Sequence, residues 1–503
     1  MEAFLNLYGG FQDALTLQNL YLCFLGCLWG SMVGVLPGIG PLAGITLLIP
    51  ATYGIDVTGA IIMLAGIYYG AMYGGSTTSI LMNIPGESAS VVTCLDGYQM
   101  TQKGRAGAAL FIAAFGSWVG GTLSVLGVML LAPVLANVAT RFGPGEIFAL
   151  LLVAFLLLGS LGTGSFLKTS AMILLGMLAG TVGMDTLTGV YRFTHGIRDL
   201  YDGLGFVPVA MGMFGVGEIL SATQESVARR VYRPRLRELL TNREEFRASI
   251  GPILRGSAIG FFIGLLPGAA HILSSFVSYT VEKRVAGRPE EFGHGRIEGV
   301  AGPETANNAA TGGAMVPFLS LGIPTTPAIA VIMVALLIHG VRPGPLFISE
   351  NPKLFWSLIA SMYLGNLILV ALNLPLIGLF VSFLRIPFRI LFPVILFVCL
   401  IGTYSISYNS FDLVILLVFG FLGFFFRKLE FDLAPFVLAL IIGPLMEEAF
   451  RQSLMRSGGS LSIFWQSPIA LAFLVVAALL LGLNLLKNLK PARRAKRGNS
   501  GGG

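Results

Sequence analysis

One segment of this sequence occurs twice and strongly constrains the structures that the chain can form. Each copy has three glycines at four-residue intervals followed by Leu-Pro-Gly: Gly26, Gly30 and Gly34 before Leu36, Pro37 and Gly38, then Gly256, Gly260 and Gly264 before Leu266, Pro267 and Gly268. Glycines with this spacing lie on one face of a helix and let a second backbone approach closely. Proline and glycine then end the helix, because proline lacks an N–H and glycine adopts unusual dihedral angles. We therefore expect two close-packed helices that break.

The apolar composition indicates that these breaks lie in a membrane. Hydrophobic residues make up 55% of the 503 residues and charged residues only 11%, whereas soluble domains carry about 25% charged residues. A transmembrane β-barrel is excluded, because the apolar runs are too long and do not alternate with polar residues. Backbone groups freed by a broken helix in lipid must be satisfied by protein or by a water-filled site. Two such breaks in corresponding halves are typical of a transporter binding site.

Apolar runs divide the chain into about 10 to 13 predicted transmembrane helices, each near the length that crosses a bilayer. Shorter broken pieces, such as residues 42–50, are expected to form re-entrant half-helices. Pro133 and residues 141–145 mark a turn, and residues 287–304 form a polar stretch that precedes another span. The predicted fold class is an all-α polytopic membrane protein.

Basic residues gather in two places and suggest how the chain is organised. We predict a first membrane half at residues 1–224, a basic cytoplasmic linker at 225–249, a second membrane half at 250–486 and a basic cytoplasmic tail at 487–503. The positive-inside rule places the linker and the tail in the cytoplasm. The first half follows an N-terminus without lysine or arginine, whereas the second follows the linker directly. The halves are therefore expected to be inverted-topology repeats. Nucleic-acid binding is not expected, since both basic clusters flank apolar spans.

Polar residues cluster after each break, between apolar segments. Residues 74–87 and 304–326 carry hydroxyl, amide and carboxylate side chains, including Glu87 and Glu304. Oxygen atoms of this kind bind hard cations, and the free N–H groups at a helix start bind a carboxylate. The residues that we predict to bind the substrate or a coupling ion are Pro37, Gly38, Gly40, Ser76, Thr77, Thr78, Asn83, Gly86, Pro267, Gly268, His271, Asn307, Asn308, Thr311, Thr325 and Thr326.

A structural role is the alternative for these side chains. Serine and threonine hydroxyls in helices often bond to the carbonyl one turn earlier and bind nothing else. His271, just after the second break, either carries a coupling proton, contacts the substrate or simply packs.

Enzyme signatures are missing from the sequence. It has neither a phosphate-binding loop nor an H-E-x-x-H zinc motif, and its four cysteines lack the spacing of a metal site. We predict no catalytic residue, no cofactor and no metal other than Na+, with Na+ or H+ as the coupling ion. Two alternatives stay open. One is an anion channel that uses the breaks as a filter, and the other is a membrane-embedded hydrolase with Ser76 as its nucleophile.

Several segments carry a family resemblance. They are residues 34–40, 67–78, 83–87, 95–98 and 298–301, together with Asn307 and Asn308. Over nearly its whole length the chain resembles the large membrane subunit of the tripartite tricarboxylate transporters, the TctA family. The resemblance implies a bacterial inner-membrane, multi-pass secondary carrier that imports an organic di- or tricarboxylate. It also implies a small four-span membrane subunit and a periplasmic solute-binding protein that delivers the substrate.

Two parts of the predicted site differ from the usual family pattern. They are residues 267–271 and residues 323–326, so the resemblance leaves the identity of the carboxylate open. For the transport step we expect alternating access with an elevator-like motion of a domain built from both copies.

Overall fold

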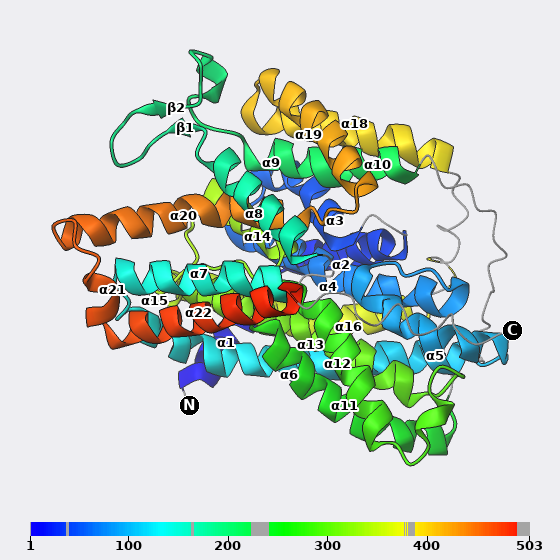
Figure 1. Ribbon diagram of the computed structural model, residues 1–503. Helices are drawn as coiled ribbons and strands as arrows, with labels where there is room; N and C mark the ends of the chain where they lie inside the picture. Colours follow the sequence, from blue (N-terminus) through cyan, green and yellow to red (C-terminus); the bar gives the residue numbers. More distant parts are fainter. Residues whose placement is uncertain are drawn as a thin grey trace, which may run out of the picture.

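The chain folds almost entirely into helices, as the predicted fold class requires. The computed structural model describes residues 2–36, 40–161, 165–222, 241–376, 378, 380 and 388–489. Within these ranges the strands are β1 (Gly183–Met184) and β2 (Tyr191–Arg192), which pair antiparallel. Figure 1 shows the long helices side by side, with this small hairpin projecting from one edge.

Two long helices of the first half begin at polar caps. Thr16 accepts the N–H of Asn19 at the start of α2, and Asp56 accepts two N–H groups at the start of α4, as N-cap residues commonly do. The helices are α1 (Glu2–Ala14), α2 (Leu17–Val35), α3 (Gly40–Leu48), η1 (Pro50–Gly54), α4 (Val57–Met82), η2 (Ser88–Ser90), α5 (Val91–Gln102), α6 (Ala106–Ala139), α7 (Pro144–Leu161), α8 (Phe166–Gly180), η3 (Arg198–Leu200), α9 (Phe206–Ala210), the π-helix η4 (Met211–Val216) and α10 (Gly217–Ala222).

The second half repeats the opening arrangement of a long helix, a break and a second helix. Its helices are α11 (Arg243–Gly264), α12 (Ala270–Val285), η6 (Pro289–Glu291), α13 (Glu298–Leu321), α14 (Pro327–Ile338), α15 (Phe347–Glu350), α16 (Pro352–Asn373), α18 (Phe388–Ser407), α19 (Phe411–Lys428), α20 (Ala434–Arg456), α21 (Ile463–Gln466) and α22 (Pro468–Leu489).

Three boundaries differ from the predictions. Helix α6 continues through Pro133 to Ala139, so the turn expected at Pro133 was wrong and the chain turns after α6 ends. Helix α13 begins at Glu298, so the end of the polar stretch predicted for residues 287–304 is helical and buried. Helix α11 begins at Arg243, inside the predicted linker, of which residues 225–240 lie outside the described part of the chain. The tail predicted for residues 487–503 also lies largely outside it.

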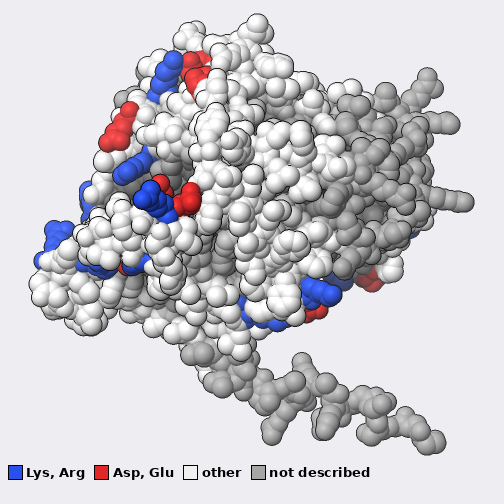
Figure 2. Space-filling model, turned by 90° about the horizontal axis from the view of Figure 1, so that it is seen from above, with Lys and Arg blue, Asp and Glu red and all other residues white. Residues whose placement is uncertain are grey.

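The apolar helices support the membrane assignment. In the described part of the chain, four helices are long and apolar enough to cross a bilayer, namely α2, α4, α6 and α16, and six more apolar helices have 10–17 residues. Helix α19 exposes Val414, Val418, Phe421 and Phe425, a spacing that places them on one lipid-facing side. Figure 2 shows a broad uncharged surface, with charged side chains gathered towards its edges. The exact number of spans and the inverted orientation of the halves stay predictions.

The glycine repeats pack as the sequence predicts. In the first copy, a Cβ on Gly26, Gly30 or Gly34 of α2 would collide with successive backbone carbonyls of α4, those of Met63, Ile67 and Ala71. In the second copy, the same collisions would occur between a Cβ on Gly256, Gly260 or Gly264 of α11 and the backbone carbonyls of Gly302, Ala306 and Ala310 of α13. Both copies therefore join their helices backbone to backbone.

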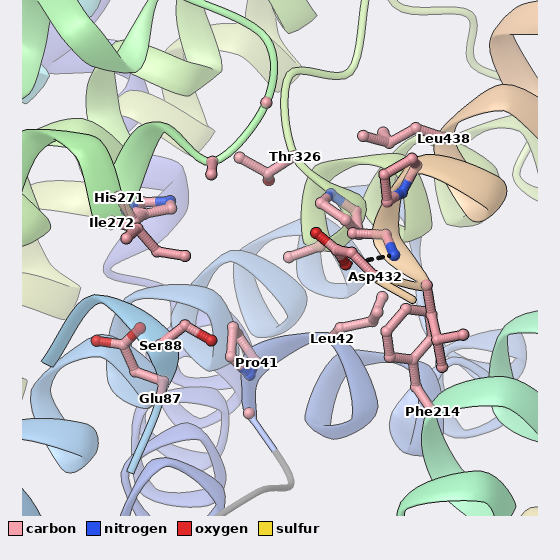
Figure 3. Close-up of a pocket in the computed structure, with 18 of the residues that line it drawn as sticks. Pro41, Leu42, Glu87, Ser88, Phe214, His271, Ile272, Thr326, Asp432 and Leu438 are labelled. Atoms are coloured by element: carbon pink, nitrogen blue, oxygen red, sulfur yellow. Dashed lines mark hydrogen bonds between the residues drawn. The ribbon is translucent and has the colours of Figure 1, made fainter. Parts of the chain in front are cut away.

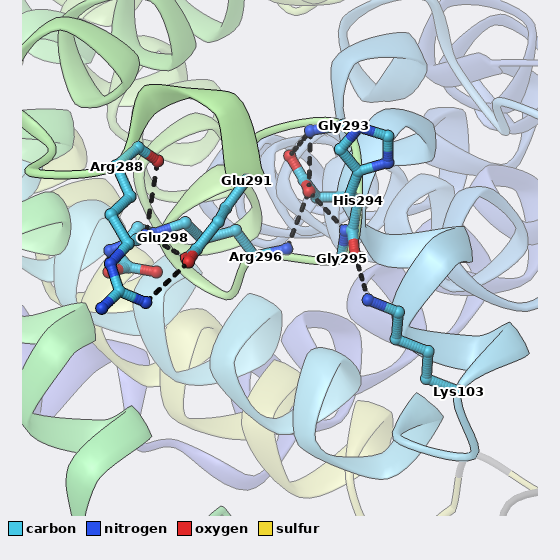
Figure 4. Close-up of polar contacts among 9 residues, drawn as sticks. Lys103, Arg288, Glu291, Gly293, His294, Gly295, Arg296 and Glu298 are labelled. Carbon is cyan, nitrogen blue, oxygen red and sulfur yellow. Dashed lines mark hydrogen bonds and ion pairs between the residues drawn. The ribbon is translucent and has the colours of Figure 1, made fainter.

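The two halves are also joined by a buried carboxylate. Asp96 of α5 accepts hydrogen bonds from the backbone N–H groups of Gly293, Gly295 and Arg296 at 2.7–3.0 Å and from the Tyr279 hydroxyl at 2.8 Å. Figure 4 shows this loop, where the Arg296 guanidinium also pairs with Glu291 and Glu298. A side chain of the first half thus fixes the connection between α12 and α13 in the second half.

Replacing Gly260 with alanine tests the backbone packing. The new Cβ would meet the backbone carbonyl of Ala306, and overpacking of this kind lowers the free energy of unfolding by about 1–3 kcal/mol. Gly482→Ala is the matched control, because nothing lies within 4 Å of its Cβ position on α22. Thermal unfolding of the purified protein in detergent measures both variants. Equal stability of the two would contradict the packing.

Replacing Asp96 with asparagine tests the buried link. The amide nitrogen cannot accept a backbone N–H, so the change is expected to lower the free energy of unfolding by about 1–3 kcal/mol. Cleavage by protease between residues 286 and 297 should become faster, because the loop loses its anchor. Asp199→Asn is the control, since Asp199 is exposed and accepts one hydrogen bond from Asn409. Unchanged protease resistance in Asp96→Asn would rule out the anchoring role.

Candidate functional site

Both predicted interruptions are present in the fold. Helix α2 ends at Val35 and α3 starts at Gly40, which has φ +64°. Helix α11 ends at Gly264 and α12 starts at Ala270, after Gly268 with φ +126°. Positive φ of this size suits glycine, because other residues meet steric strain there. The predicted site residues Pro37 and Gly38 lie outside the described residues.

In each copy, the loop that follows the third helix lies against the break or against the last turn of the helix that leads into it. In the second copy, the N–H of Gly268 donates to the carbonyl of Thr325 at 3.0 Å. In the first copy, Gly86 lies so close to the carbonyl of Gly34 that a Cβ would collide with it. The corresponding parts of the two copies therefore assemble in the same way.

The two assemblies face a common cavity of about 840 Å³. Gly40 and Pro41 from the first break line it, as do Gly268 and Ala269 from the second. Figure 3 shows Glu87 and His271, from different copies, on one side of this space, with Asp432 across from them. The cavity is therefore shared between the copies and closed on a further side by α20.

Several helices of the described part of the chain begin at this cavity. The first residues of α3, α14 and α20 line it, and at the start of α12 the N-cap Ala269 and the second residue His271 do so. A helix start carries roughly half an elementary positive charge together with unpaired N–H groups. Thr326 caps α14 by accepting the N–H of Ile329, and Asp432 accepts the N–H of Ala434 at the start of α20. Helix α12 has no such side-chain cap within the described residues, so its first N–H groups are available to an anion.

Charged side chains mark the mouth of the cavity. Lys168 from α8 and Glu430 after α19 both line it, with side chains that are 37% and 89% exposed. The Lys168 ammonium donates to the carbonyl of Leu429 at 2.7 Å and lies 5.2 Å from the centre of the Phe431 ring. Arg427 also lines the cavity, with its guanidinium 5.9 Å from the Phe214 ring. Lys168 also pairs with Glu430 at 3.9 Å, so the cavity lining includes two cations, and its opening carries an exposed charged pair.

A chain of hydrogen bonds connects the copies beside the cavity. The Tyr68 hydroxyl lies 2.6 Å from Nε2 of His271, and Nδ1 of His271 lies 3.1 Å from the carbonyl oxygen of Asn307. Because that carbonyl can only accept, Nδ1 carries the proton and Nε2 of the neutral ring accepts from Tyr68. The Asn307 amide then donates to Oε1 of Glu87 at 2.9 Å. A protonated His271 would have to reverse the role of the Tyr68 hydroxyl.

A second carboxylate lies behind this chain. Glu304 of α13 is 1% exposed and accepts hydrogen bonds from the hydroxyls of Ser76 and Thr93. Within the described part of the chain it forms no ion pair. A buried carboxylate without a positive partner is unfavourable when ionised.

The structure separates the predicted site residues into groups. Gly40, Gly86, Gly268, His271 and Thr326 line the cavity, and Asn307 reaches it through Glu87. Thr78 and Thr311 bond to the carbonyls of Gly75 and Asn308, one turn earlier, as the structural alternative describes. Others bond to more distant groups: Ser76 to Glu304, Asn308 to Ser117 and Thr325 to the carbonyl of Ala314.

Three predicted residues have other positions. Asn83 ends α4 in the left-handed conformation and is exposed. Pro267 is half-buried within the second break. Thr77 lines a second, smaller cavity instead of the large one.

Several cavity residues were absent from the predicted set. They are Tyr68, Glu87, Lys168, Phe214, Arg427 and Asp432. The segment from Asp432 to Pro435 does carry a local signal, because an acidic residue shortly before a proline is typical of a helix start. Tyr68 carries none, since its role depends on a contact with His271, 203 positions away.

Comparison with known proteins identifies relatives. Residues 20–438 match the model of the tripartite tricarboxylate transporter TctA family. An Agrobacterium vitis protein, described as an uncharacterized 52.8 kDa protein in the TAR-I ttuC' 3' region, is 48% identical over 493 residues, which cover 98% of each chain. A second Agrobacterium vitis protein, from the TAR-II ttuC' 3' region, is 48% identical over 241 residues, 47% of this chain and 97% of its own. No solved structure matches.

Cysteine labelling tests whether the cavity is open to water. In a Cys94→Ser background, where the other native cysteines are buried, we expect Ser88→Cys to react rapidly with a charged maleimide. Ser90→Cys, on the same short helix η2, should react slowly, because Ser90 is 0% exposed and bonded to Ser79. Reaction follows the exposure of the thiol. Equal labelling rates in mass spectrometry would contradict an open cavity lined by Ser88.

Proposed function

This chain belongs to the tripartite tricarboxylate transporter TctA family, and from that membership we propose that it is the large membrane subunit of a secondary active importer. Its substrate is an organic di- or tricarboxylate, and a Na+ or H+ gradient drives uptake. A periplasmic solute-binding protein delivers the substrate, and a small four-span membrane subunit completes the transporter in the bacterial inner membrane. Residues 225–249 and the C-terminal tail face the cytoplasm.

The convergence of several helix starts on one cavity carries this proposal. Helix starts attract anions, and half-helix starts serve transported anions in this way in other carriers. A volume of about 840 Å³ lies within the usual range for small-molecule sites, about 300–1,000 Å³. A carboxylate of the substrate binds at the uncapped start of α12, while Lys168 and Arg427 attract further carboxylates from the mouth.

The carboxylates of the site give a physical reason for coupling to a cation. Glu87 and Asp432 line the same cavity as the helix starts, and like charges repel strongly in a medium of low dielectric constant. A carboxylate substrate therefore enters favourably only when a cation or proton compensates this negative charge. Substrate and coupling ion then bind together, which is the requirement for symport.

The shared cavity also supports alternating access. Both breaks contribute to it, and the halves are held together by Asp96 and by close packing of α6 against α13, where Gly116 and Gly120 lie against Thr305. A unit joined in this way can move as one body relative to the helices around it, as an elevator-like mechanism requires. The hydrolase alternative loses support, because Ser76 bonds to a carboxylate and does not line the large cavity.

Uptake by reconstituted protein tests the proposed function. The chain is combined with its two partner subunits in liposomes, and uptake of radiolabelled di- and tricarboxylates is measured under separate Na+ and pH gradients. We expect saturable uptake that depends on one of these gradients. Uptake that persists at the same rate without either gradient would instead indicate a channel.

A matched pair of histidine variants locates the site in the same assay. His271→Ala removes the contacts to Tyr68 and Asn307 and should lower the initial uptake rate about tenfold, equivalent to about 1.4 kcal/mol. His339→Ala is the control, because His339 ends α14 and does not line the cavity. Equal rates for the two variants would place the substrate site elsewhere.

A further inference from the structure

A second cavity lies between α4, α6 and α16, apart from the substrate cavity. Its volume is about 10 Å³, which is enough for one water-sized occupant. Five residues with a side-chain oxygen line it, namely Tyr73, Ser76, Thr77, Ser117 and Asn373, together with Leu110, Ala113 and Ala114. Its polar lining is therefore composed of hydroxyl and amide groups.

Two of these oxygens are buried and lack a partner. Oη of Tyr73 and Oδ1 of Asn373 make no hydrogen bond within the part of the chain that the structure describes, although the residues are only 3% and 5% exposed. Native proteins rarely leave a buried polar atom unsatisfied, and an ion or ordered water usually accounts for such atoms. The pair therefore points to an occupant.

The orientation of the Asn373 amide is determined by its neighbours. Its nitrogen donates to the hydroxyl of Ser31 at 3.2 Å and to the carbonyl of Leu369 at 3.0 Å. A flipped amide would place its oxygen against the Leu369 carbonyl, where two acceptors would repel. The oxygen of Asn373 is thus the atom left for the cavity.

A carboxylate is bonded to one of the residues that line this cavity. The Ser76 hydroxyl donates its proton to Glu304, so the Ser76 oxygen keeps its lone pairs for another partner. Glu304 is 1% exposed and has only hydroxyl partners, Ser76 and Thr93, among the described residues. A cation bound beside Ser76 would lie one hydroxyl away from this carboxylate and would compensate its charge.

We propose that this second cavity is a binding site for a single Na+ ion. Hydroxyl and amide oxygens are the ligands of hard cations, and neutral ligands beside one carboxylate suit a single positive charge better than a divalent ion. The proposed role of the ion rests on the proposed function, in which it is the coupling ion. Helix α4 connects the two sites, because Met72 lines the substrate cavity and Tyr73, the next residue, lines this one.

Thermal unfolding of the purified chain tests the site without substrate or partners. NaCl is titrated against choline chloride at constant ionic strength, and KCl is titrated in parallel. We expect a saturable, Na+-specific rise in the unfolding temperature, as for any ligand that binds only the folded state. No Na+-specific rise would mean that the cavity holds water, and an equal effect of K+ would contradict Na+ as the occupant.

Variants place the effect at this cavity. Thr77→Val removes one oxygen at nearly constant volume, and Asn373→Ala removes another; each should raise the Na+ concentration at half-maximal stabilisation about tenfold or more. Asn366→Ala is the matched control, because Asn366 is a buried asparagine on α16 that lies against Gly121 and does not line the cavity. If Asn373→Ala does not fold, the Na+ titration of Thr77→Val alone still tests whether Na+ binds in this cavity. A midpoint unchanged in Thr77→Val would overturn the site.

The two proposals fail in different ways. Na+-specific stabilisation that is lost in Thr77→Val supports the site, even if uptake by the reconstituted transporter does not depend on a Na+ gradient. Gradient-driven uptake without any Na+-specific stabilisation overturns the site and leaves the importer proposal standing.

Discussion

A broken helix in lipid exposes backbone groups that water cannot reach, and the rest of this structure depends on how those groups are satisfied. The chain brings the break after α2 and the break after α11 to one cavity. The second break bonds to the loop of its own copy, and in the first copy that loop lies against the last turn of α2. Backbone groups that would be unfavourable against lipid thereby lie at a shared cavity. The same arrangement supplies the positive helix starts that make the space attractive to an anion.

Close packing of backbones makes this arrangement possible. A break can be held in place only if the helices that lead into it are fixed, and glycines against carbonyls fix α2 on α4 and α11 on α13. These contacts need no polar side chain, so the hydroxyls, amides and carboxylates of α4 and α13 can form hydrogen bonds with other parts of the chain. Ser76 and Glu304 then meet across the two copies, as do Tyr68 and His271.

The sequence predicted those features that follow from local spacing. The glycine intervals indicated the close helix pairs, and the Pro-Gly pairs indicated both breaks, since each depends on only a few neighbouring residues. The candidate site was predicted less well. The hydroxyls of Thr78 and Thr311 bond to carbonyls three residues earlier. The sequence alone does not show whether a polar side chain in a helix bonds to its own backbone, packs in the core or lines a cavity.

The residues that sequence reasoning missed come from distant elements. Asp432 and Arg427 reach the cavity only because α19 and α20 pack across it, and no spacing near the breaks indicates this. The boundary of α13 was missed for a related reason. Residues 298–304 resemble a loop in composition, but α5 and α6 pack against them, and Ser76 of α4 and Thr93 of α5 bond to Glu304. Tertiary contacts thus decided what composition alone could not.

Asp96 has a consequence for how the protein is made. Its carboxylate belongs to the first half, but the N–H groups that satisfy it are at residues 293–296, nearly two hundred positions later in the chain. A ribosome that adds about 5–20 residues each second leaves this carboxylate unsatisfied for many seconds of synthesis. The contacts of Asp96 are therefore completed only after the second half has been synthesised, so the first half cannot reach its final structure as an independent unit.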